Sequence, residues 1–323
     1  MTLILTRSDV LSMITLPEVT AAVRTAHADL ARGAAVAPTP PVMRLPGSDS
    51  AFLAMAAASG PAGLAAVKLL ADVPGNRERG LPVQRSAILT VATADGSCEA
   101  VLDGGAVTRF RTAAATAVAT AALARPESRV LGLIGAGALA RAHVEALRPV
   151  LPFERIVVWS RTDATAKGFA ADIDAEIAST PEEVVRTADV LCTLTPSRDP
   201  VVRGDWFRPG LHVNAVGAPP RPDHREIDSE GMRRARVIVD SRLSTLHESG
   251  DALIPLREGV FGLDHVSDEL GEVLIGAKSG RTEPDQITLY NSLGIGLQDL
   301  AAARLLIDTA RRRGIGTEID LAA

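Results

Sequence analysis

The chain has 323 residues, enough for two domains of ordinary size, and its formal net charge is −5 at pH 7. Hydrophobic residues make up 46% and charged residues 23%, as in a globular protein that buries a full core. Aromatic residues make up only 3%. The sequence therefore lacks both the stacking platforms and the basic surface of a nucleic-acid-binding protein, and we expect no nucleic-acid partner.

The cysteines and the apolar runs indicate the cellular compartment. Cys98 and Cys192 lie in apolar, strand-like runs without a Cys or His at metal-ligand spacing. We expect them to be small core residues in a reducing compartment, and we expect no metal site. The N-terminus has no signal-peptide pattern, and Arg109 and Arg111 interrupt the apolar run 106–124. The sequence thus predicts a cytoplasmic protein without a membrane segment.

The first third of the chain predicts helices followed by a β-rich unit. Residues 8–33 have helical spacing and end at Gly33. Residues 34–107 alternate short apolar runs with Gly and Pro, and residues 94–96, Ala-Asp-Gly, are typical of a hairpin turn. An Ala-rich helix is expected at 108–125.

The pattern then becomes regular. Strands are expected at 129–134, 155–160, 189–194, 211–217 and 236–240, with helices between them. Such alternation is typical of a parallel sheet covered on both faces. A last helix near 292–313 is long enough to pack back onto the N-terminal unit. We predict an α/β fold in which a doubly wound, Rossmann-type domain, 116–304, is inserted into a discontinuous α+β domain, 1–115 with 305–323, closed by the C-terminal helix.

The stretch VLGLIGAGALARAHVEAL changes from an apolar strand to a helical pattern at its glycines. A strand followed by G-x-G-x-x-G/A and a helix is the dinucleotide-binding fingerprint. Gly135 would make the tight turn, Gly137 would let the backbone approach a pyrophosphate, and Ala140 would keep the helix close to the strand. The helix N-terminus, at Ala138 and Leu139, would bind the phosphates. The alternative is a purely structural turn.

The next strand indicates which nucleotide binds. It ends at Ser160, Arg161 and Thr162, where an NAD site usually offers Asp or Glu to the ribose 2′-hydroxyl. A guanidinium and two hydroxyls stand there instead, and Arg161 is able to bind a 2′-phosphate through two hydrogen bonds. We predict NADP(H) as the cofactor. NAD(H) is the alternative, with Asp163 contacting the ribose and Arg161 an exposed loop residue.

Three cations in the β-rich unit and at its border stand out. Lys68 lies in the apolar run GLAAVKLLADV, where a buried ammonium requires an anion and often serves proton transfer; the alternative is a lysine that reaches solvent from an edge strand. Arg111 lies near the expected start of the Ala-rich helix, where a cation opposes the helix dipole unless a carboxylate binds there. Arg44, in PPVMRLPG, is the third cation. Taken alone, both arginines could be solvated. Together with a nucleotide domain, the three cations suit a small substrate whose carboxylate lies next to the carbon that exchanges hydride.

In these stretches the chain resembles the ornithine cyclodeaminase/mu-crystallin family over nearly its whole length. The matching segments include PPVMRL, VKLLADVPGNRERGLP, VLDGGAVTRFRTAAA, GLIGAGALARAHVEAL, NAVGA, RPDHREID, VDSRLSTLHESGDAL, DELGEVLIGAKSGR and NSLGIGLQDLAAARLL. The resemblance implies a β-rich domain that binds a small imino or amino acid and forms a homodimer. It implies that Arg44, Lys68 and Arg111 hold the substrate carboxylate and serve the reacting nitrogen.

The resemblance also extends the expected cofactor site. Thr112 and Ser292 match positions near the phosphates and the nicotinamide. Thr195 and Val216, at the ends of two later strands, are further expected cofactor contacts.

One position departs from the family pattern. Cyclodeaminating members place an Asp just after NAVG(G/A), but Pro219 stands here, in a loop one residue longer. Deprotonation of an ornithine or lysine amine thereby loses its base, unless Asp223 of the same loop replaces it. The segments RPDHREID and LHESGDAL are more similar to the mu-crystallin, or ketimine reductase, side.

The sequence therefore predicts an NADP(H)-dependent oxidoreductase, an imine reductase that converts a small α-imino (ketimine) carboxylate to an amino acid, with Lys68 assisting proton delivery. One alternative is an amino-acid dehydrogenase or an ammonia-releasing cyclodeaminase. The other is a nucleotide-bound binding or structural protein.

Overall fold

The computed structural model describes residues 1–321. It divides into two compact units, the first formed by Met1–Thr112 with the segment from Ile295 onward, the second by Ala113–Gly294. One boundary falls inside helix α3 (Gly104–Leu123) and the other just before helix α11 (Gly296–Arg313). The boundaries predicted from the sequence were 115/116 and 304/305. All of α11 belongs to the first unit because it packs against that unit's sheet and against α2 (Leu16–Ala31).

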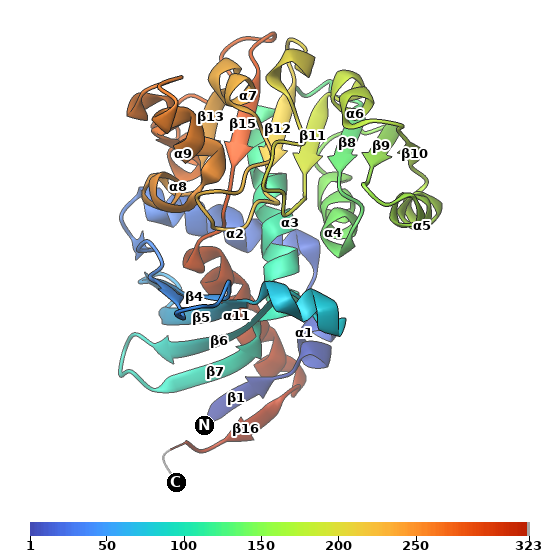
Figure 1. Cartoon of the computed structure of the whole chain (residues 1–323). Helices are drawn as coiled ribbons and strands as arrows, with labels where there is room; N and C mark the ends of the chain where they lie inside the picture. Colours follow the sequence, from blue (N-terminus) through green and yellow to red (C-terminus); the bar gives the residue numbers. More distant parts are fainter. Residues whose placement is uncertain (322–323) are drawn as a thin grey trace. The chain divides into compact units, whose positions relative to one another are not determined.

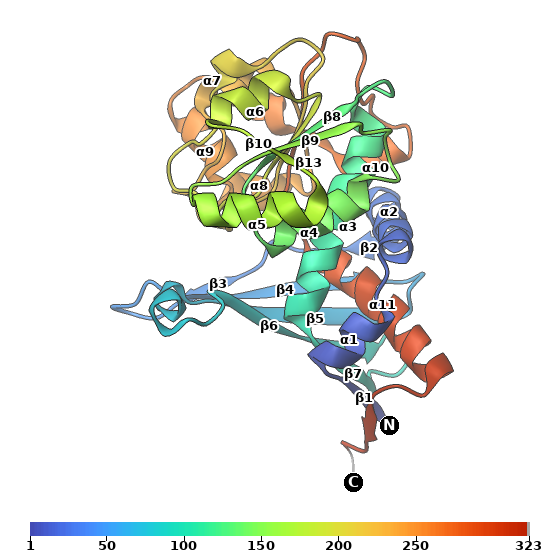
Figure 2. The same ribbon diagram turned by 90° about the vertical axis from the view of Figure 1, so that its right-hand side faces the viewer.

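The first unit is a mostly antiparallel sheet with helices against one face (Figures 1 and 2). Its strand order is β16-β1-β7-β6-β5-β4-β2, and β3 pairs with β4. The strands are β1 (Thr2–Leu5), β2 (Ala35–Val36), β3 (Val42–Arg44), β4 (Ala51–Ser59), β5 (Leu64–Asp72), β6 (Gln84–Ala92), β7 (Cys98–Asp103) and β16 (Thr317–Ile319). The helices besides α2 and α11 are α1 (Arg7–Met13) and the short η1 (Pro74–Arg79).

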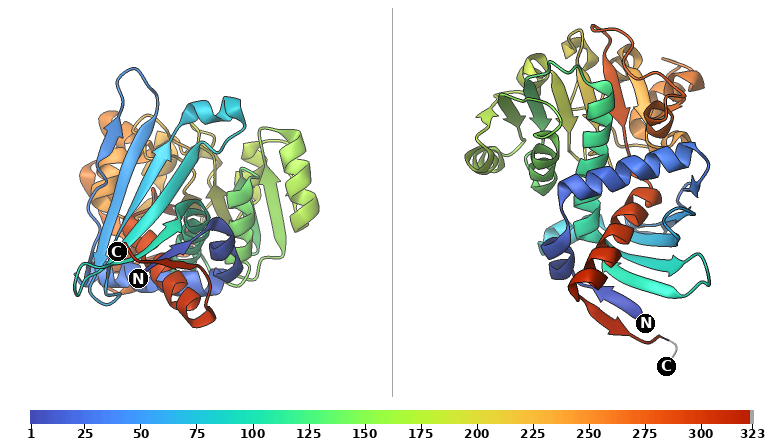
Figure 3. Two further views of the ribbon diagram at one scale, coloured as in Figure 1. Left: turned by 90° about the horizontal axis from the view of Figure 1, so that it is seen from below. Right: turned by 180° about the vertical axis from the view of Figure 1, so that it is seen from behind.

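Alternation decides which face of this sheet is inside. β4 and β5 bury every second residue, so Leu53, Met55 and Leu70 form an inner apolar cluster beneath the helices. Figure 3 shows α2 and α11 crossing within this unit, seen from behind. The hairpin predicted at 94–96 joins β6 to β7, and Gly96 has the positive φ of +78° that such a turn requires.

The second unit is a sheet of eight parallel strands in the order β10-β9-β8-β11-β12-β15-β13-β14. The strands are β8 (Val130–Ile134), β9 (Arg155–Trp159), β10 (Glu176–Ile177), β11 (Val190–Thr193), β12 (His212–Ala215), β13 (Arg236–Val239), β14 (Asp268–Glu269) and β15 (Thr288–Asn291). The helices after α3 are α4 (Ala138–Leu147), α5 (Asp163–Ile173), α6 (Pro181–Thr187), α7 (Ser229–Arg234), α8 (Arg242–Glu248), α9 (Gly250–Arg257) and α10 (Leu270–Leu274), with short turns η2 (Gly204–Trp206) and η3 (Leu263–Val266).

All five predicted strands of this unit are present, and the predicted fold class is confirmed. Strand β15 was not predicted, because its four residues follow an irregular segment with no periodicity to reveal them. It lies between β12 and β13, so the sheet order could not be read from the sequence. Gly132 allows Ala188 and Val184 to pack closely against β8, because a Cβ at residue 132 would lie 2.7 Å from Ala188 Cβ and 2.8 Å from Val184 Cγ1. No helix in the described part of the chain is long and apolar enough to cross a membrane.

Candidate active site

The loop between β8 and α4 has the geometry of a phosphate cradle. Gly135 has φ of +109°, and a Cβ on it would lie 3.0 Å from the carbonyl oxygen of Leu194, so the turn requires glycine. Gly137 is the N-cap of α4, no side chain caps this helix, and the space where a Gly137 Cβ would project is open to 4 Å. Ala138 and Leu139 begin the first turn. These residues fit a pyrophosphate, which the free N–H groups and the helix dipole would bind.

The other predicted cofactor contacts of the second unit gather at one edge of its sheet. The arrowheads of β8, β11, β12 and β15 point to the same edge because the strands are parallel (Figure 1). Ligands of open parallel sheets bind at this carboxyl edge. The residues that follow the strand ends are Ser160, Arg161 and Thr162 after β9, Thr195 after β11, Val216 after β12 and Ser292 after β15.

A buried carboxylate, Glu226, holds two of these strand ends together. Its oxygens accept hydrogen bonds from Thr195 N and Oγ1 at 2.6 and 2.7 Å, from Thr193 Oγ1 at 2.8 Å and from Gly217 N at 2.7 Å. Burial and the nearby Asp251 raise the pKa of Glu226 to about 7, against the effect of the Thr193 and Thr195 hydrogen bonds. Glu226 was not predicted as a site residue, because an isolated Glu in RPDHREID has no periodicity that marks it as buried.

Asp240, at the end of β13, orients the hydroxyl of Ser292. Ser292 Oγ donates to Asp240 Oδ2 at 2.7 Å, and the Gly294 N–H donates to the same oxygen at 2.6 Å. Ser292 is buried, so its hydroxyl is held in one direction rather than free in solvent. Asp240 was not predicted from the sequence either.

The end of β9 adjoins a cavity of about 340 Å³. It is lined by Trp159, Ser160, Asp163, Ala166, Lys167, Ile177, Ala178 and Ser179. Arg161 is exposed next to it, and Thr162 is the N-cap of α5. The loop thus offers hydroxyls and a guanidinium, while its carboxylate, Asp163, is the first residue of the helix.

Lys68 lies inside the first unit and has the anionic partner that burial demands. It projects from β5 on the same face as Leu70, and its side chain is 0% exposed. Its Nζ lies 2.7 Å from Asp299 Oδ2, on α11, and donates to Thr108 Oγ1, on α3, at 3.3 Å. The burial excludes a lysine that reaches solvent from an edge strand.

Arg111 shares this carboxylate. Its Nε donates to Asp299 Oδ1 at 3.2 Å, and one terminal nitrogen donates to Gln298 Oε1 at 2.9 Å. The predicted start of its helix was wrong: α3 begins at Gly104, where Asp103 accepts from the Ala106 N–H. Arg111 is therefore two turns inside the helix, and the dipole at the helix start does not bear on it.

A second layer supports the arginine. Gln298 Nε2 lies 3.1 Å from His27 Nε2, on α2, and both residues are buried. Burial lowers the pKa of His27 to about 4, so the ring is neutral and accepts this hydrogen bond. The amide of Gln298 is thus oriented with its oxygen toward Arg111. We call Lys68, Arg111, Asp299, Gln298 and His27 the cationic cluster.

The charges of the cationic cluster set the behaviour of Lys68. Burial first, and then the neighbouring Arg111, lower the pKa of Lys68 to about 8, while the charge and the hydrogen bond of Asp299 act in the opposite direction. Two cations and one anion leave one net positive charge in a buried site. Such a site favours one further negative group.

Two predicted residues lie apart from these groups. Arg44 shares the sheet face of Lys68, because it pairs with Ala51, which pairs with Asp72 on β5, but it is exposed and stands on the outer strand β3. The structure does not join it to the cationic cluster. Thr112 belongs to the first unit, unlike the other predicted cofactor contacts, and its hydroxyl donates to the Thr108 carbonyl at 2.8 Å.

The loop that follows β12 contains Pro219 and the carboxylate of Asp223. By the family resemblance, Pro219 matches the position of the Asp expected in cyclodeaminating members. Asp223 is exposed and contacts Arg198 and His224. Partial burial acts to raise the pKa of Asp223, but hydrogen bonds from His224 and Arg198 outweigh it and lower this pKa to about 2. The carboxylate is therefore a poor proton acceptor.

Comparisons with known proteins identify the family of the chain. The model of the "Ornithine cyclodeaminase/mu-crystallin family" matches residues 1–314. Ketimine reductase mu-crystallin of Mus musculus is 40% identical over 244 residues, which are 75% of each chain. The structure of Thermococcus litoralis Delta(1)-pyrroline-2-carboxylate reductase in complex with NADH and L-proline is 34% identical, with a TM-score of 0.94, and the match covers 98% of this chain and 100% of that one. An archaeal alanine dehydrogenase dimer with bound NAD is 33% identical, with a TM-score of 0.93 and 99% coverage of both chains. The chain belongs to the ornithine cyclodeaminase/mu-crystallin family.

Proposed function

We propose that the protein is an NADP(H)-dependent reductase that converts a small α-imino carboxylate to an amino acid. The observation that carries this proposal is the cationic cluster, a buried lysine and arginine that share one carboxylate and keep one net positive charge. Its relatives are named as reductases of ketimines and of pyrroline-2-carboxylate and as an amino-acid dehydrogenase, all nicotinamide or imine chemistry.

In this proposal Lys68 delivers the proton. A reduced nicotinamide supplies hydride when it is bound, and the imine carbon receives it. The C=N π electrons then move to nitrogen, which takes a proton from the Lys68 ammonium or from a water held by it. A pKa of about 8 suits this role, because the ammonium form predominates at neutral pH and still gives up its proton readily.

Arg111 would hold the substrate carboxylate. Its Nε and one terminal nitrogen already donate to Asp299 and Gln298, so the remaining N–H groups, at the end of the guanidinium, are the ones left for substrate. The single net positive charge of the cluster suits a monocarboxylate. Arg44, exposed on the same sheet face, would add a second contact as the substrate enters.

The preference for NADP(H) rests on the end of β9. No carboxylate stands among Ser160, Arg161 and Thr162, and the exposed guanidinium of Arg161 is available to a 2′-phosphate. Lys167 adds a positive group to the adjoining cavity. Gly135, Gly137, Ala138, Leu139, Thr195, Val216 and Ser292 would hold the rest of the dinucleotide, and Thr112 would join them.

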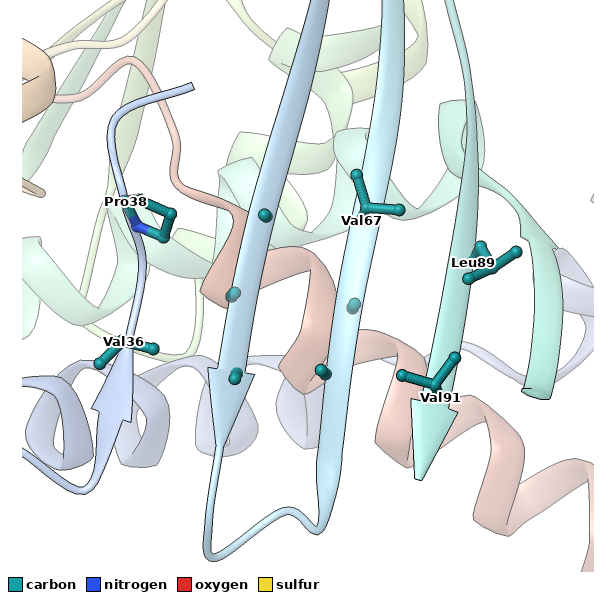
Figure 4. Close-up of a pocket in the computed structure, with 10 residues that line it drawn as sticks. Val36, Pro38, Val67, Leu89 and Val91 are labelled. Atoms are coloured by element: carbon teal, nitrogen blue, oxygen red, sulfur yellow. The ribbon is translucent and has the colours of Figure 1, made fainter. Parts of the chain in front are cut away.

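Homodimer formation would use the outer face of the first unit's sheet. Figure 4 shows the apolar groove there, with a volume of about 360 Å³, where Val36, Pro38, Val67, Leu89 and Val91 project from the face opposite Lys68. The strand register aligns Ala56, Val67, Leu89 and Val101 across four strands. Leu89 is 41% exposed and Leu69 49%, and water-exposed apolar ladders of this kind are typical of subunit interfaces.

Amino-acid dehydrogenation is the second candidate, because the archaeal alanine dehydrogenase matches 99% of the chain. The same Lys68 and Arg111 would serve it, with an imine formed from a 2-oxo acid and ammonia. Cyclodeamination is disfavoured, because Pro219 replaces the family Asp and Asp223 is ion-paired.

A substrate panel tests the proposal. NADPH and NADH oxidation would be followed with pyrroline-2-carboxylate, with piperideine-2-carboxylate and with pyruvate plus ammonia. We expect the cyclic imines and NADPH to give the highest kcat/KM. Faster turnover of pyruvate plus ammonia would favour the dehydrogenase, and ammonia release from ornithine would favour the cyclodeaminase. Tight NADPH binding without turnover of any compound would revive the non-enzymatic alternative.

A further inference from the structure

Asp299 contacts both cations of the cluster with a separate oxygen for each. Its Oδ2 lies 2.7 Å from Lys68 Nζ and its Oδ1 lies 3.2 Å from Arg111 Nε. The side chain is 1% exposed, so water cannot replace either contact. A carboxylate in this position separates two like charges that would otherwise repel each other inside the protein.

The surroundings of Lys68 contain few other ionisable groups. On the inner face, the neighbours of Lys68 across the sheet, Met55 on β4 and Ile88 on β6, are apolar. Helix α3 contributes Arg111, α11 contributes Asp299, and α2 contributes His27, which contacts Gln298. On the sheet itself, Asp72 lies four residues along β5 and Arg44 two strands away. Asp299 is therefore the one anion that the structure places in contact with Lys68 among the described residues.

We propose that Asp299 is a positioning residue that keeps Lys68 protonated for proton delivery and turns Arg111 so that the end of its guanidinium faces the substrate carboxylate. The inference rests on the proposed function. It assigns a role to a residue on the C-terminal helix that the sequence analysis did not single out.

The two roles follow from the same geometry. With Asp299 in place, Lys68 is buried as an ammonium, whereas an uncharged neighbour would leave burial and Arg111 to drive the proton off. Because Asp299 engages Nε, and Gln298 one terminal nitrogen, the guanidinium cannot rotate about its stem. The substrate carboxylate then meets N–H groups of fixed direction.

The test is the Asp299→Asn variant, which removes the charge with little change in shape. The chain contains three lysines, Lys68, Lys167 and Lys278, so a protein labelled with ¹³C at lysine Cε gives few NMR signals. Lys167→Arg and Lys278→Arg variants assign them. The Lys68 signal reports its protonation midpoint directly and without turnover. In parallel, kcat/KM for the best imine is measured from pH 6 to pH 10.

We expect D299N to lower the Lys68 midpoint by about one to three pH units, and to move the alkaline limb of kcat/KM down by a similar amount. KM should rise as well, because Arg111 loses its orientation. Asp299→Glu should restore part of the midpoint. Asp308→Asn is the matched control, since Asp308 lies on the same helix in a partly exposed pair with Arg304 and should change neither quantity.

An unchanged Lys68 midpoint in D299N would overturn the inference, whatever the activity. If the Lys68 midpoint falls in D299N while the alkaline limb of kcat/KM does not move, the link between Lys68 protonation and proton delivery is overturned. If no imine is turned over by the wild type, the proposed function fails while the NMR titration still judges the contact. If D299N does not fold, the charge of Asp299 is removed in a protein that already lacks Arg111: the Lys68 midpoint should be lower in Arg111→Gln/Asp299→Asn than in Arg111→Gln alone. Equal midpoints in these two variants would overturn the inference.

Discussion

Replacement of Lys68 by Met should remove activity and, at neutral pH, increase stability. Methionine has a similar length and no charge, and Asp299 keeps its pairing with Arg111, so no buried carboxylate is left alone. General acid catalysis contributes about 10²–10⁴-fold, and we expect turnover to fall by at least that lower figure. NADPH binding should be unchanged, because the phosphate cradle lies in the other unit.

The stability change can be worked from the structure. Burial and Arg111 lower the pKa of Lys68 from its ordinary 10.5 to about 8, which corresponds to roughly 3 kcal/mol at about 1.36 kcal/mol per pH unit. Because the folded-state pKa lies below the unfolded one, the folded protein bears this cost in full below pH 8, and the cost disappears as the pH rises toward 10.5. We therefore expect K68M to be more stable than the wild type by about 1–3 kcal/mol at pH 7 and by much less at pH 10.

Denaturant unfolding at both pH values, with NADPH turnover on the same samples, measures the two effects together. Lys278→Met, at an exposed lysine beside Asp268, is the control and should show neither. A K68M protein that is less stable than the wild type at pH 7, by an amount that does not change at pH 10, would refute the reasoning. Retained turnover would refute the role of Lys68 in catalysis.

Three further predictions concern the cofactor, the dimer and the strand ends. Arg161→Ala should raise KM for NADPH about tenfold or more and leave KM for NADH nearly unchanged, because a charge-assisted hydrogen bond from arginine to phosphate contributes about 1.5–3 kcal/mol of binding. Equal changes in the two KM values would contradict the 2′-phosphate contact. Leu89→Lys, in the apolar groove, should give a monomer by light scattering, whereas Leu263→Lys, at an exposed leucine of the second unit, should leave the dimer intact. Burial raises the folded-state pKa of Glu226 above its ordinary 4.5 to about 7. As the pH rises from 4.5 to 7, the free energy of unfolding of the wild type should therefore fall relative to that of Glu226→Gln. Parallel pH profiles of the two proteins would show that Glu226 is not buried as described.

Local patterns were sufficient for most elements. The strand that precedes Gly135, the helix after it and the alternation along β4 and β5 follow from periodicity within a few residues. The start of α6 is also set locally, because the side chain of its N-cap, Thr180, accepts a hydrogen bond from the Glu183 N–H three residues later. Lys68 was identifiable as buried because its neighbours along the strand are apolar.

Contacts between distant segments were not readable in this way. Strand β15 inserts between β12 and β13, an order that no local pattern encodes. Arg111 was placed near a helix start because the two glycines at 104 and 105 hid the first turn of α3. Glu226 and Asp240, which hold strand ends together, look like ordinary surface acids in the sequence.

The clearest division lies within the cationic cluster itself. An apolar strand with a single lysine predicts that an anion must be nearby, since a bare ammonium is too costly to bury. Which anion it is depends on how α11 packs across β5, and that packing brings Asp299 beside Lys68 from the far end of the chain. Sequence periodicity reports the solvent exposure of each residue, whereas the partner of a buried charge is chosen by the tertiary packing of elements that are remote along the chain.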